Sequence, residues 1–172
     1  DTHEQMCMYL RSFGQMHQAK LQDAFKNIPD SIFTDKLEVI DWGCGQAIGT
    51  TCLFDYLNSI NYLSNVEAVT LVEPSKASLE RALLHISPYI QDGVDINHVN
   101  DYFENVRPEH LPGNESRTRL HLFSNILDVA AIDLKHLSKV IDESVVSDNL
   151  LICVGPLNPN NPRIDSFFRY FD

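Results

Sequence analysis

The sequence predicts an α/β domain, with an open, mostly parallel β-sheet and layers of helices on both of its faces. Short apolar runs alternate with amphipathic stretches from residue 37 to the end of the 172-residue chain, which is typical of strands and helices in turn. A glycine-containing turn over residues 43–49 joins the first apolar run directly to the next amphipathic stretch. Apolar residues make up 44% of the chain, which is enough for one core, so we expect a single domain.

The expected elements alternate regularly after one long N-terminal helix. Apolar residues recur near a period of 3.6 over residues 4–28, and Pro29 with Asp30 closes that helix. Strands are predicted at residues 37–40, 68–72, 94–99, 120–123 and 150–154. Further helices are predicted at residues 47–63, from the N-cap Ser75 to Pro88, at 129–145, and over an aromatic stripe at 164–171. Two stretches rich in Pro and polar residues, 107–119 and 158–162, are predicted to be surface connections.

Polar side chains follow four of the predicted strands. In a parallel sheet, ligands bind beyond the carboxyl ends of the strands, near the point where the strand order reverses. The residues at these ends are therefore the first candidates for binding, namely Asp41, Glu73, Asn100, Asp101, Ser124 and Asn125.

The glycine turn is the strongest single indication of a ligand site. Gly43 and Gly45 have no Cβ, so the backbone can adopt positive φ and approach a ligand closely. The free N–H groups at the start of the following helix face the same space. We therefore expect the turn to hold the cofactor, and we expect a side chain introduced at Gly43 to enter the ligand space.

Two acids flank this turn, and each has two possible roles. Asp41 can brace the turn by accepting backbone N–H bonds, or it can meet a cationic group of the ligand through water. Glu73 can accept both hydroxyls of a ribose, or it can cap the helix that follows it. A glycine turn together with an acid at the next strand end favours ligand binding.

The spacing in the turn distinguishes between two adenosine cofactors. A dinucleotide site needs a third glycine or alanine where this chain has Ile48, because a pyrophosphate lies on the helix N-terminus. Asp41, just ahead of the glycines, would also repel a pyrophosphate. S-adenosyl-L-methionine (SAM) carries no phosphate and has a positively charged sulfonium, so the pattern favours SAM as the cofactor.

Four motifs resemble those of the class I SAM-dependent methyltransferases. Residues 41–46 resemble the first motif, and residues 69–74 resemble the second, with Glu73 in the place of the ribose-binding acid. Residues 100–101 are similar to the third motif, whose Asp or Asn contacts the adenine amino group, and residues 122–125 resemble the fourth, which faces the transferred methyl and the substrate. The resemblance covers residues 37–155 and implies a Rossmann-like methyltransferase fold. It implies cofactor contacts by Asp41, Gly43, Cys44, Gly45, Gln46, Glu73, Pro74, Asn100, Asp101 and Ser124.

The resemblance also gives the N-terminal segment a role. The first helix of such domains often packs over the cofactor, so residues 1–36 are expected on the cofactor side of a SAM-binding unit formed by residues 37–172. Phe13 and His17 share one face of that helix with Tyr9, and they join Asn125 as candidates on the substrate side. His17 also has a simpler interpretation as a histidine of the helix face. No other histidine stands out as a general base, so the implied catalysis is mainly positioning.

The chain departs from the family pattern in three places. Ala47 replaces a frequent third glycine, and Asn125 is followed by Ile126 and Leu127 instead of the Pro-Pro-aromatic run of amino-methylating members. The second change disfavours methylation of a nucleobase or amide nitrogen by that route. No sequence follows the fifth predicted strand to make the usual closing antiparallel pair, so that strand is expected at an edge that a further domain or partner chain could cover.

Composition narrows the remaining choices. The net charge of −11 gives no support to a nucleic-acid partner, so the expected methyl acceptor is a small molecule or a protein. The four cysteines have no metal-ligand spacing, which favours reduced thiols in the cytoplasm and no metal site. No run of residues predicts a membrane span. The chain begins with Asp1 instead of Met, and we expect a domain of a longer protein.

The sequence thus predicts a SAM-dependent methyltransferase domain. The alternative is a catalytically inactive scaffold of the same fold, which binds SAM or nothing within a larger protein. A nicotinamide-dependent oxidoreductase is the third possibility, and Ile48 and Asp41 disfavour it.

Overall fold

The fold is given by a computed structural model that describes residues 2–156 and 162–171. Within these residues it contains α1 (His3–Lys26), β1 (Lys36–Trp42), α2 (Ile48–Ser59), β2 (Val66–Val72), α3 (Lys76–Ile86), β3 (Asp95–Val99), β4 (Arg117–Ser124), α4 (Leu134–Glu143), β5 (Asn149–Val154) and α5 (Arg163–Phe168). Short 3₁₀ turns fill several connections, such as η4 (Phe103–Asn105). Most of the predicted loop 158–162 lies outside the described residues.

The strands form one five-stranded sheet in the order β3-β2-β1-β4-β5, and every described pair is parallel. This confirms the predicted α/β class and the open parallel sheet. The described residues contain no antiparallel strand beside β5, as expected for a sheet without the closing pair. The strand order reverses at β1 and β4, so the crevice beyond their carboxyl ends is where a ligand site is expected.

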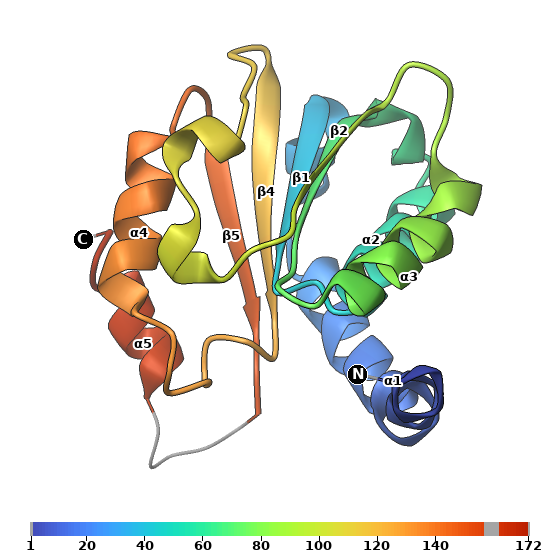
Figure 1. The fold of residues 1–172 in the computed structure, drawn as a ribbon. Helices are drawn as coiled ribbons and strands as arrows, with labels where there is room; N and C mark the ends of the chain where they lie inside the picture. Colours follow the sequence, from blue (N-terminus) through green and yellow to red (C-terminus); the bar gives the residue numbers. More distant parts are fainter. Residues whose placement is uncertain (1, 157–161, 172) are drawn as a thin grey trace.

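Helices cover both faces of the sheet (Figure 1). On one face, α2 and α3 pack over a core that includes Leu53 and Leu79, and α1 packs against α2. On the other face, α4 and α5 enclose a second core around Trp42 and Phe167. Figure 1 shows α1 at the end of the sheet where β1 runs into α2, which is the carboxyl end of the strands.

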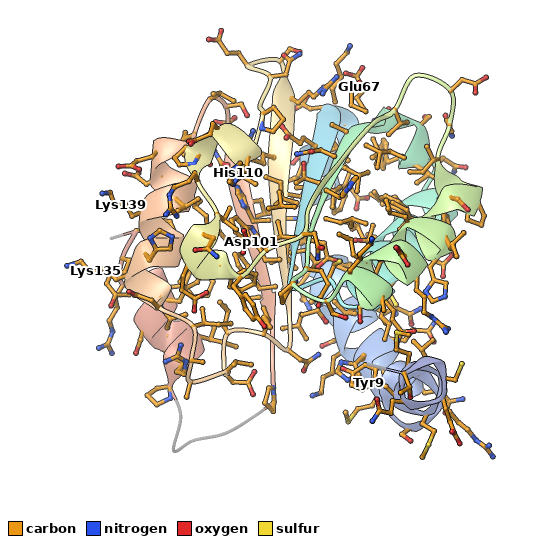
Figure 2. The ribbon with its side chains drawn as sticks, viewed as in Figure 1. Tyr9, Glu67, Asp101, His110, Lys135 and Lys139 are labelled. Atoms are coloured by element: carbon orange, nitrogen blue, oxygen red, sulfur yellow. The ribbon has the colours of Figure 1, made fainter. Side chains whose placement is uncertain are left out.

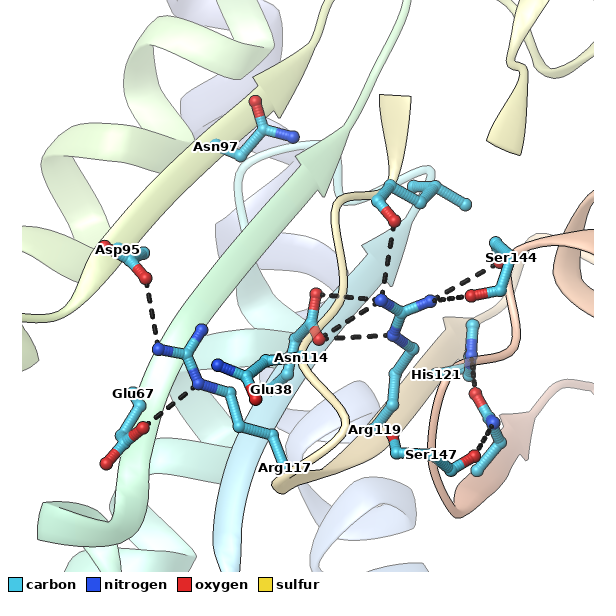
Figure 3. A network of polar contacts seen from close by, with 12 residues as sticks. Glu38, Glu67, Asp95, Asn97, Asn114, Arg117, Arg119, His121, Ser144 and Ser147 are labelled. Carbon is cyan, nitrogen blue, oxygen red and sulfur yellow. Dashed lines mark hydrogen bonds and ion pairs between the residues drawn. The ribbon is translucent and has the colours of Figure 1, made fainter. Parts of the chain in front are cut away.

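The strand β4 begins earlier than the sequence predicted. Residues 117–119 were predicted as part of a surface connection, but they are the first residues of β4. Arg119 is fully buried, and its Nη2 lies 3.2 Å from Oε2 of the buried Glu38 on β1 (Figure 3). Arg117 pairs with Glu67 and Asp95 on the neighbouring strands, at 3.0 and 3.1 Å. An Arg at every second position looks like an exposed loop in the sequence, so this part of the strand was not recognised. In the fold, both Arg side chains are paired with acids on neighbouring strands.

Two of the observed helices are much shorter than the predicted ones. The helix predicted from residue 129 begins at Leu134, because the Asp133 carboxylate caps it by accepting the N–H groups of Lys135 and His136. The helix predicted to reach residue 63 ends at Ser59. The N-cap role of Ser75 is confirmed, since its side chain accepts the N–H of Ser78.

Helix α1 is only partly a core helix. His17, Leu21 and Phe25 are buried, but Tyr9 and Met16, which belong to the predicted apolar face, are 44% and 48% exposed. Helix α1 therefore turns only part of its predicted apolar face toward the core. No helix in the described part of the chain is both long enough and apolar enough to cross a membrane.

Candidate functional site

A cavity of about 460 Å³ lies beyond the carboxyl ends of β1, β2 and β4. This volume is in the range of small-molecule and cofactor sites. Its wall combines the glycine turn, the first half of α1 and two further strand ends. The lining residues are Gln5, Met6, Tyr9, His17, Gly43, Cys44, Gly45, Gln46, Ile48, Gly49, Glu73, Ser78 and Ser124.

The glycine turn has the predicted backbone conformation. Gly43 and Gly45 have φ of +65° and +54°, and the N–H of Gly43 donates to the carbonyl of Val72 at 2.8 Å. A Cβ added at Gly45 would meet nothing within 4 Å, whereas one at Gly43 would lie 2.7 Å from Cγ1 of Ile126. The expectation that a side chain at Gly43 enters the ligand space is therefore wrong, and Gly45 is the glycine that faces open space.

Glu73 connects the end of β2 to the glycine turn. Its Oε2 accepts the N–H of Gly45 at 3.0 Å, and its Oε1 accepts the N–H of Ser75 at 2.9 Å. A carboxylate has about four acceptor positions, so two remain for a ligand in the cavity that Glu73 lines. The geometry is compatible with both roles considered for this acid, and ribose binding stays a prediction.

Asp41 lies beneath the turn and does not line the cavity. Its Oδ2 accepts the hydroxyl of Thr50 at 2.6 Å and the N–H of Thr50 at 3.2 Å, while Oδ1 has no hydrogen-bond partner among the described residues. Burial raises the pKa of Asp41 to about 6, although the bonds from Thr50 favour the ionised form. This arrangement corresponds to the bracing role, because Asp41 ties β1 to the start of α2.

Four predicted cofactor residues do not line the cavity, namely Asp41, Pro74, Asn100 and Asp101. The Asn100 amide donates to the carbonyls of Glu73 and Pro74, at 2.8 and 3.0 Å, and so clamps the turn after β2. Asp101 accepts the side-chain N–H of Asn105 and the N–H of Tyr102, and these bonds lower its pKa. Asn100 and Asp101 line a separate surface groove, and Figure 2 shows Asp101 well apart from Tyr9 on α1.

The other predicted cofactor residues line the cavity. The Gln46 side chain donates to the carbonyl of Met6 at 3.0 Å, which ties the turn to α1. Cys44 is buried, and burial raises the pKa of its thiol far above the usual range, so no thiolate forms there. Ser124 ends β4 on the opposite side of the turn from Glu73.

His17 connects α1 to the end of β4. The Asn125 amide donates to Nδ1 of His17, and the Tyr9 hydroxyl oxygen lies 3.4 Å from Nε2. His17 is 6% exposed, and burial together with the nearby charge of Lys20 lowers its pKa, so the ring is neutral at pH 7. The structure thus brings two of the three substrate-side candidates together, while the side chain of Phe13, the third, is outside the described part.

Several lining residues were not predicted from the sequence. The first half of α1 contributes Gln5 and Met6, which lie one helical turn before Tyr9, a residue already expected on the cofactor side of that helix. Extending the expected face by that turn would have found them. Ser78 also lines the cavity, and its hydroxyl contacts the sulfur of Met6 at 3.8 Å.

Neither protein-family models nor curated protein sequences give a match to this sequence. Solved structures with a similar fold are SAM-dependent methyltransferases. One from Leishmania major has a TM-score of 0.54 at 13% identity, over 92% of this chain and 62% of the other. A methyltransferase from Podospora anserina with S-adenosylhomocysteine (SAH) bound has a TM-score of 0.45 at 11% identity, over 99% of this chain and 86% of the other. One from Mesorhizobium loti has a TM-score of 0.42 at 15% identity, over 72% and 46%.

These likenesses concern the fold, because all three identities are low. The chain spans 62% of the length of the Leishmania protein to which it is compared. The all-parallel order β3-β2-β1-β4-β5 is that of the Rossmann-like fold of class I SAM-dependent methyltransferases. The fold implied by the sequence motifs is thereby confirmed.

Proposed function

We propose that this chain is a SAM-dependent methyltransferase domain that binds SAM in the cavity at the glycine turn. One observation carries the proposal. Glu73 accepts the N–H of Gly45, so the strand-end acid and the open glycine form one wall of a cavity at the switch point of the sheet. The likeness of the fold to that of the Leishmania methyltransferase supports the proposal.

The charge of the cavity supports a cationic ligand. Among the described residues that line it, Glu73 is the one acid, and none is Lys or Arg. A pyrophosphate would therefore meet a carboxylate without a compensating cation, while a sulfonium is attracted. Ile48, at the position where a dinucleotide site needs a small residue, lines the cavity as well.

The residues present fit a bound SAM. When bound, SAM supplies an activated methyl group for displacement by a nucleophile. Glu73 would hold the ribose hydroxyls through its remaining acceptor positions, and Gly45 would allow the backbone to approach the ligand. Ser124 and His17 lie at the β4 end of the cavity, where they would face the acceptor. We propose a small molecule or a protein as that acceptor and the cytoplasm as the location of the protein.

One observation favours the alternative of a scaffold that transfers no methyl group. Both Glu73 oxygens and the Asn100 amide already bond to the chain's own backbone. They stabilise the site without a ligand, as a purely structural role requires. Ligand binding separates the proposal from a scaffold that binds nothing, and transfer of a methyl group would separate it from a scaffold that binds SAM.

Calorimetry with SAM, SAH and NAD tests the proposal. SAM and SAH should bind, and NAD should not. Glu73→Ala should weaken SAM binding by about 1–3 kcal/mol, because charge-assisted hydrogen bonds are lost. Glu80→Ala is a matched control, since Glu80 is an exposed carboxylate on α3. Binding of NAD without binding of SAM would refute SAM as the cofactor. If none of the three ligands binds, the scaffold is favoured. An unchanged SAM affinity in Glu73→Ala would mean that Glu73 only caps the helix that follows it.

A further inference from the structure

Strand β3 forms one edge of the sheet, and its outer side is open. The Val99 carbonyl accepts the N–H of Glu73, at 3.0 Å, just beyond the end of β2. Backbone groups of alternate residues point to opposite sides of a strand, so the odd-numbered residues of β3 bond to β2. The N–H and C=O groups of Ile96 and His98 therefore point outward, and no strand of the described chain pairs with them. Such an edge can pair with a further strand.

A surface groove of about 430 Å³ lies beside this edge. One wall is β3 itself, including His98, and the other is formed by residues 109–112. The Asn97 side chain donates to the carbonyl of His110 at 2.9 Å, which fixes the second wall to β3 without using the free backbone groups of the strand. Two residues of the lining, Asp101 and His110, are labelled in Figure 2. The groove leaves room for an extended chain along the open edge.

The charge of the groove is negative. Among the described residues, its lining has two acids, Asp101 and Glu109, together with two histidines and no Lys or Arg. Hydrogen bonds from Asn105 and Tyr102 lower the pKa of Asp101, so this carboxylate is ionised at pH 7. The Arg107 guanidinium, close by in the sequence, donates to backbone carbonyls of its own turn. This lining is complementary to a basic partner, and the net charge of −11 attracts such a partner at long range.

We propose that the open edge of β3 binds an extended basic segment of a partner protein as an added strand. The backbone groups of Ile96 and His98 supply the main-chain hydrogen bonds. Successive side chains of the added strand point to opposite faces of the sheet. On the face of Asn97, a Lys or Arg meets the carboxylates of Asp101 and Glu109. On the other face, a β-branched residue lies beside Ile96, which is 44% exposed.

The preferred segment therefore alternates basic and β-branched residues. This surface is independent of the proposed function, because none of the residues that line the groove lines the cofactor cavity.

Three peptides distinguish an added strand from attraction by charge alone. The first is a fluorescent peptide of alternating Lys and Val, the second replaces Lys by Glu, and the third is the first peptide with alternate backbone nitrogens methylated. Fluorescence anisotropy at low ionic strength measures their affinities. The first peptide should bind, and the other two should bind at least about tenfold more weakly, because one loses the charge and the other loses main-chain donors.

Protein variants test the two parts of the site. Ile96→Pro removes an outward N–H that β2 does not use, so an edge strand tolerates it, and it should weaken binding of the Lys-Val peptide about tenfold relative to Ile96→Ala. Glu109→Gln should weaken binding about threefold, whereas Glu80→Gln, which changes an exposed carboxylate on α3, should change it by less than about 1.5-fold.

Several results would overturn the proposal. It is wrong if the Lys-Val peptide does not bind, or if the N-methylated peptide binds as tightly as its parent. Equal affinities for Ile96→Pro and Ile96→Ala would also exclude the added strand and leave attraction by charge. Circular dichroism checks the fold of Ile96→Pro. If this variant fails to fold, the N-methylated peptide decides the question, because it leaves the protein unchanged.

Discussion

At the scale of single residues, the two glycines of the turn have different tasks. Gly43 has positive φ and faces the side chain of Ile126, so its missing Cβ makes room for packing within the protein. Gly45 also has positive φ, but its missing Cβ leaves open space in the cavity wall. Their neighbour Asp41 stabilises the turn from below through Thr50.

A matched pair of alanine substitutions tests this difference. Gly45→Ala should lower the free energy of unfolding by about 1–2 kcal/mol, from the left-handed backbone alone, and should weaken SAM binding. Gly43→Ala should cost about 2–4 kcal/mol, because overpacking against Ile126 is added to the same strain. Urea denaturation measures both. The clash is disproved if adding Ile126→Ala to Gly43→Ala recovers none of the lost stability.

At the scale of elements, a buried ion pair joins β1 to β4. Arg119 and Glu38 are 0% and 1% exposed, and Nη1 of Arg119 also donates to the carbonyl of Ser144 at 2.8 Å. Burial raises the pKa of Glu38, while Arg119 favours its ionised form. The pair connects the amino-terminal ends of the two central strands, far from the cavity at their carboxyl ends.

Removing one partner of this pair should be costly. Arg119→Met should lower the free energy of unfolding by about 3–5 kcal/mol, because it leaves the Glu38 carboxylate buried and unpaired. Arg117→Met is the control: its partners Glu67 and Asp95 are 30% and 73% exposed, so about 1 kcal/mol or less is expected. Adding Glu38→Leu to Arg119→Met should recover most of the loss. Urea denaturation measures the free energy of unfolding of each variant. An equal loss for the two Arg variants would contradict the claim that burial makes the Arg119–Glu38 pair the more important one.

At the scale of the whole molecule, two buried groups make stability respond to pH in opposite directions. His121 accepts the indole N–H of Trp42 and bonds to Asn149, and burial lowers its pKa from 6.5 to about 4. Its contribution is complete above pH 6.5 and is lost as the pH falls toward 4. Asp41 has its pKa raised from 3.8 to about 6, so it stabilises the fold more as the pH falls through the same range.

The two contributions should nearly cancel in the wild-type protein between pH 7 and pH 4. Each shift of about two units corresponds to about 3 kcal/mol. Relative to the wild type, His121→Gln should gain about 3 kcal/mol of unfolding free energy on going from pH 7 to pH 4, and Asp41→Asn should lose about 3 kcal/mol. Urea denaturation at the two pH values measures these differences. A constant difference for either variant would show that its group does not titrate as described.

Local sequence patterns determined the α/β class, the five strands and the glycine turn. Hydrophobic periodicity and the position of glycines can both be recognised within a few residues of sequence. They also placed Glu73 and Ser124 at the ends of their strands, because the apolar run of each strand stops there. Both residues line the cavity. The start of β4 could not be found in this way. Arg119 looks exposed until Glu38, from another strand 81 residues away, is placed against it.

The features of the candidate site can also be separated into those predicted from the sequence and those seen only in the structure. The sequence by itself determined the glycine turn and the acid that follows the next strand, because both depend on short-range geometry. Only the tertiary structure decided that Asn100 and Asp101 face a separate groove, that Gly45 faces the open space, and that Asn125 meets His17 over 108 residues of chain. Contacts between distant segments depend on how the helices pack on the sheet. The pattern within one segment shows which face is buried, but it does not show which residues of the other segment that face meets.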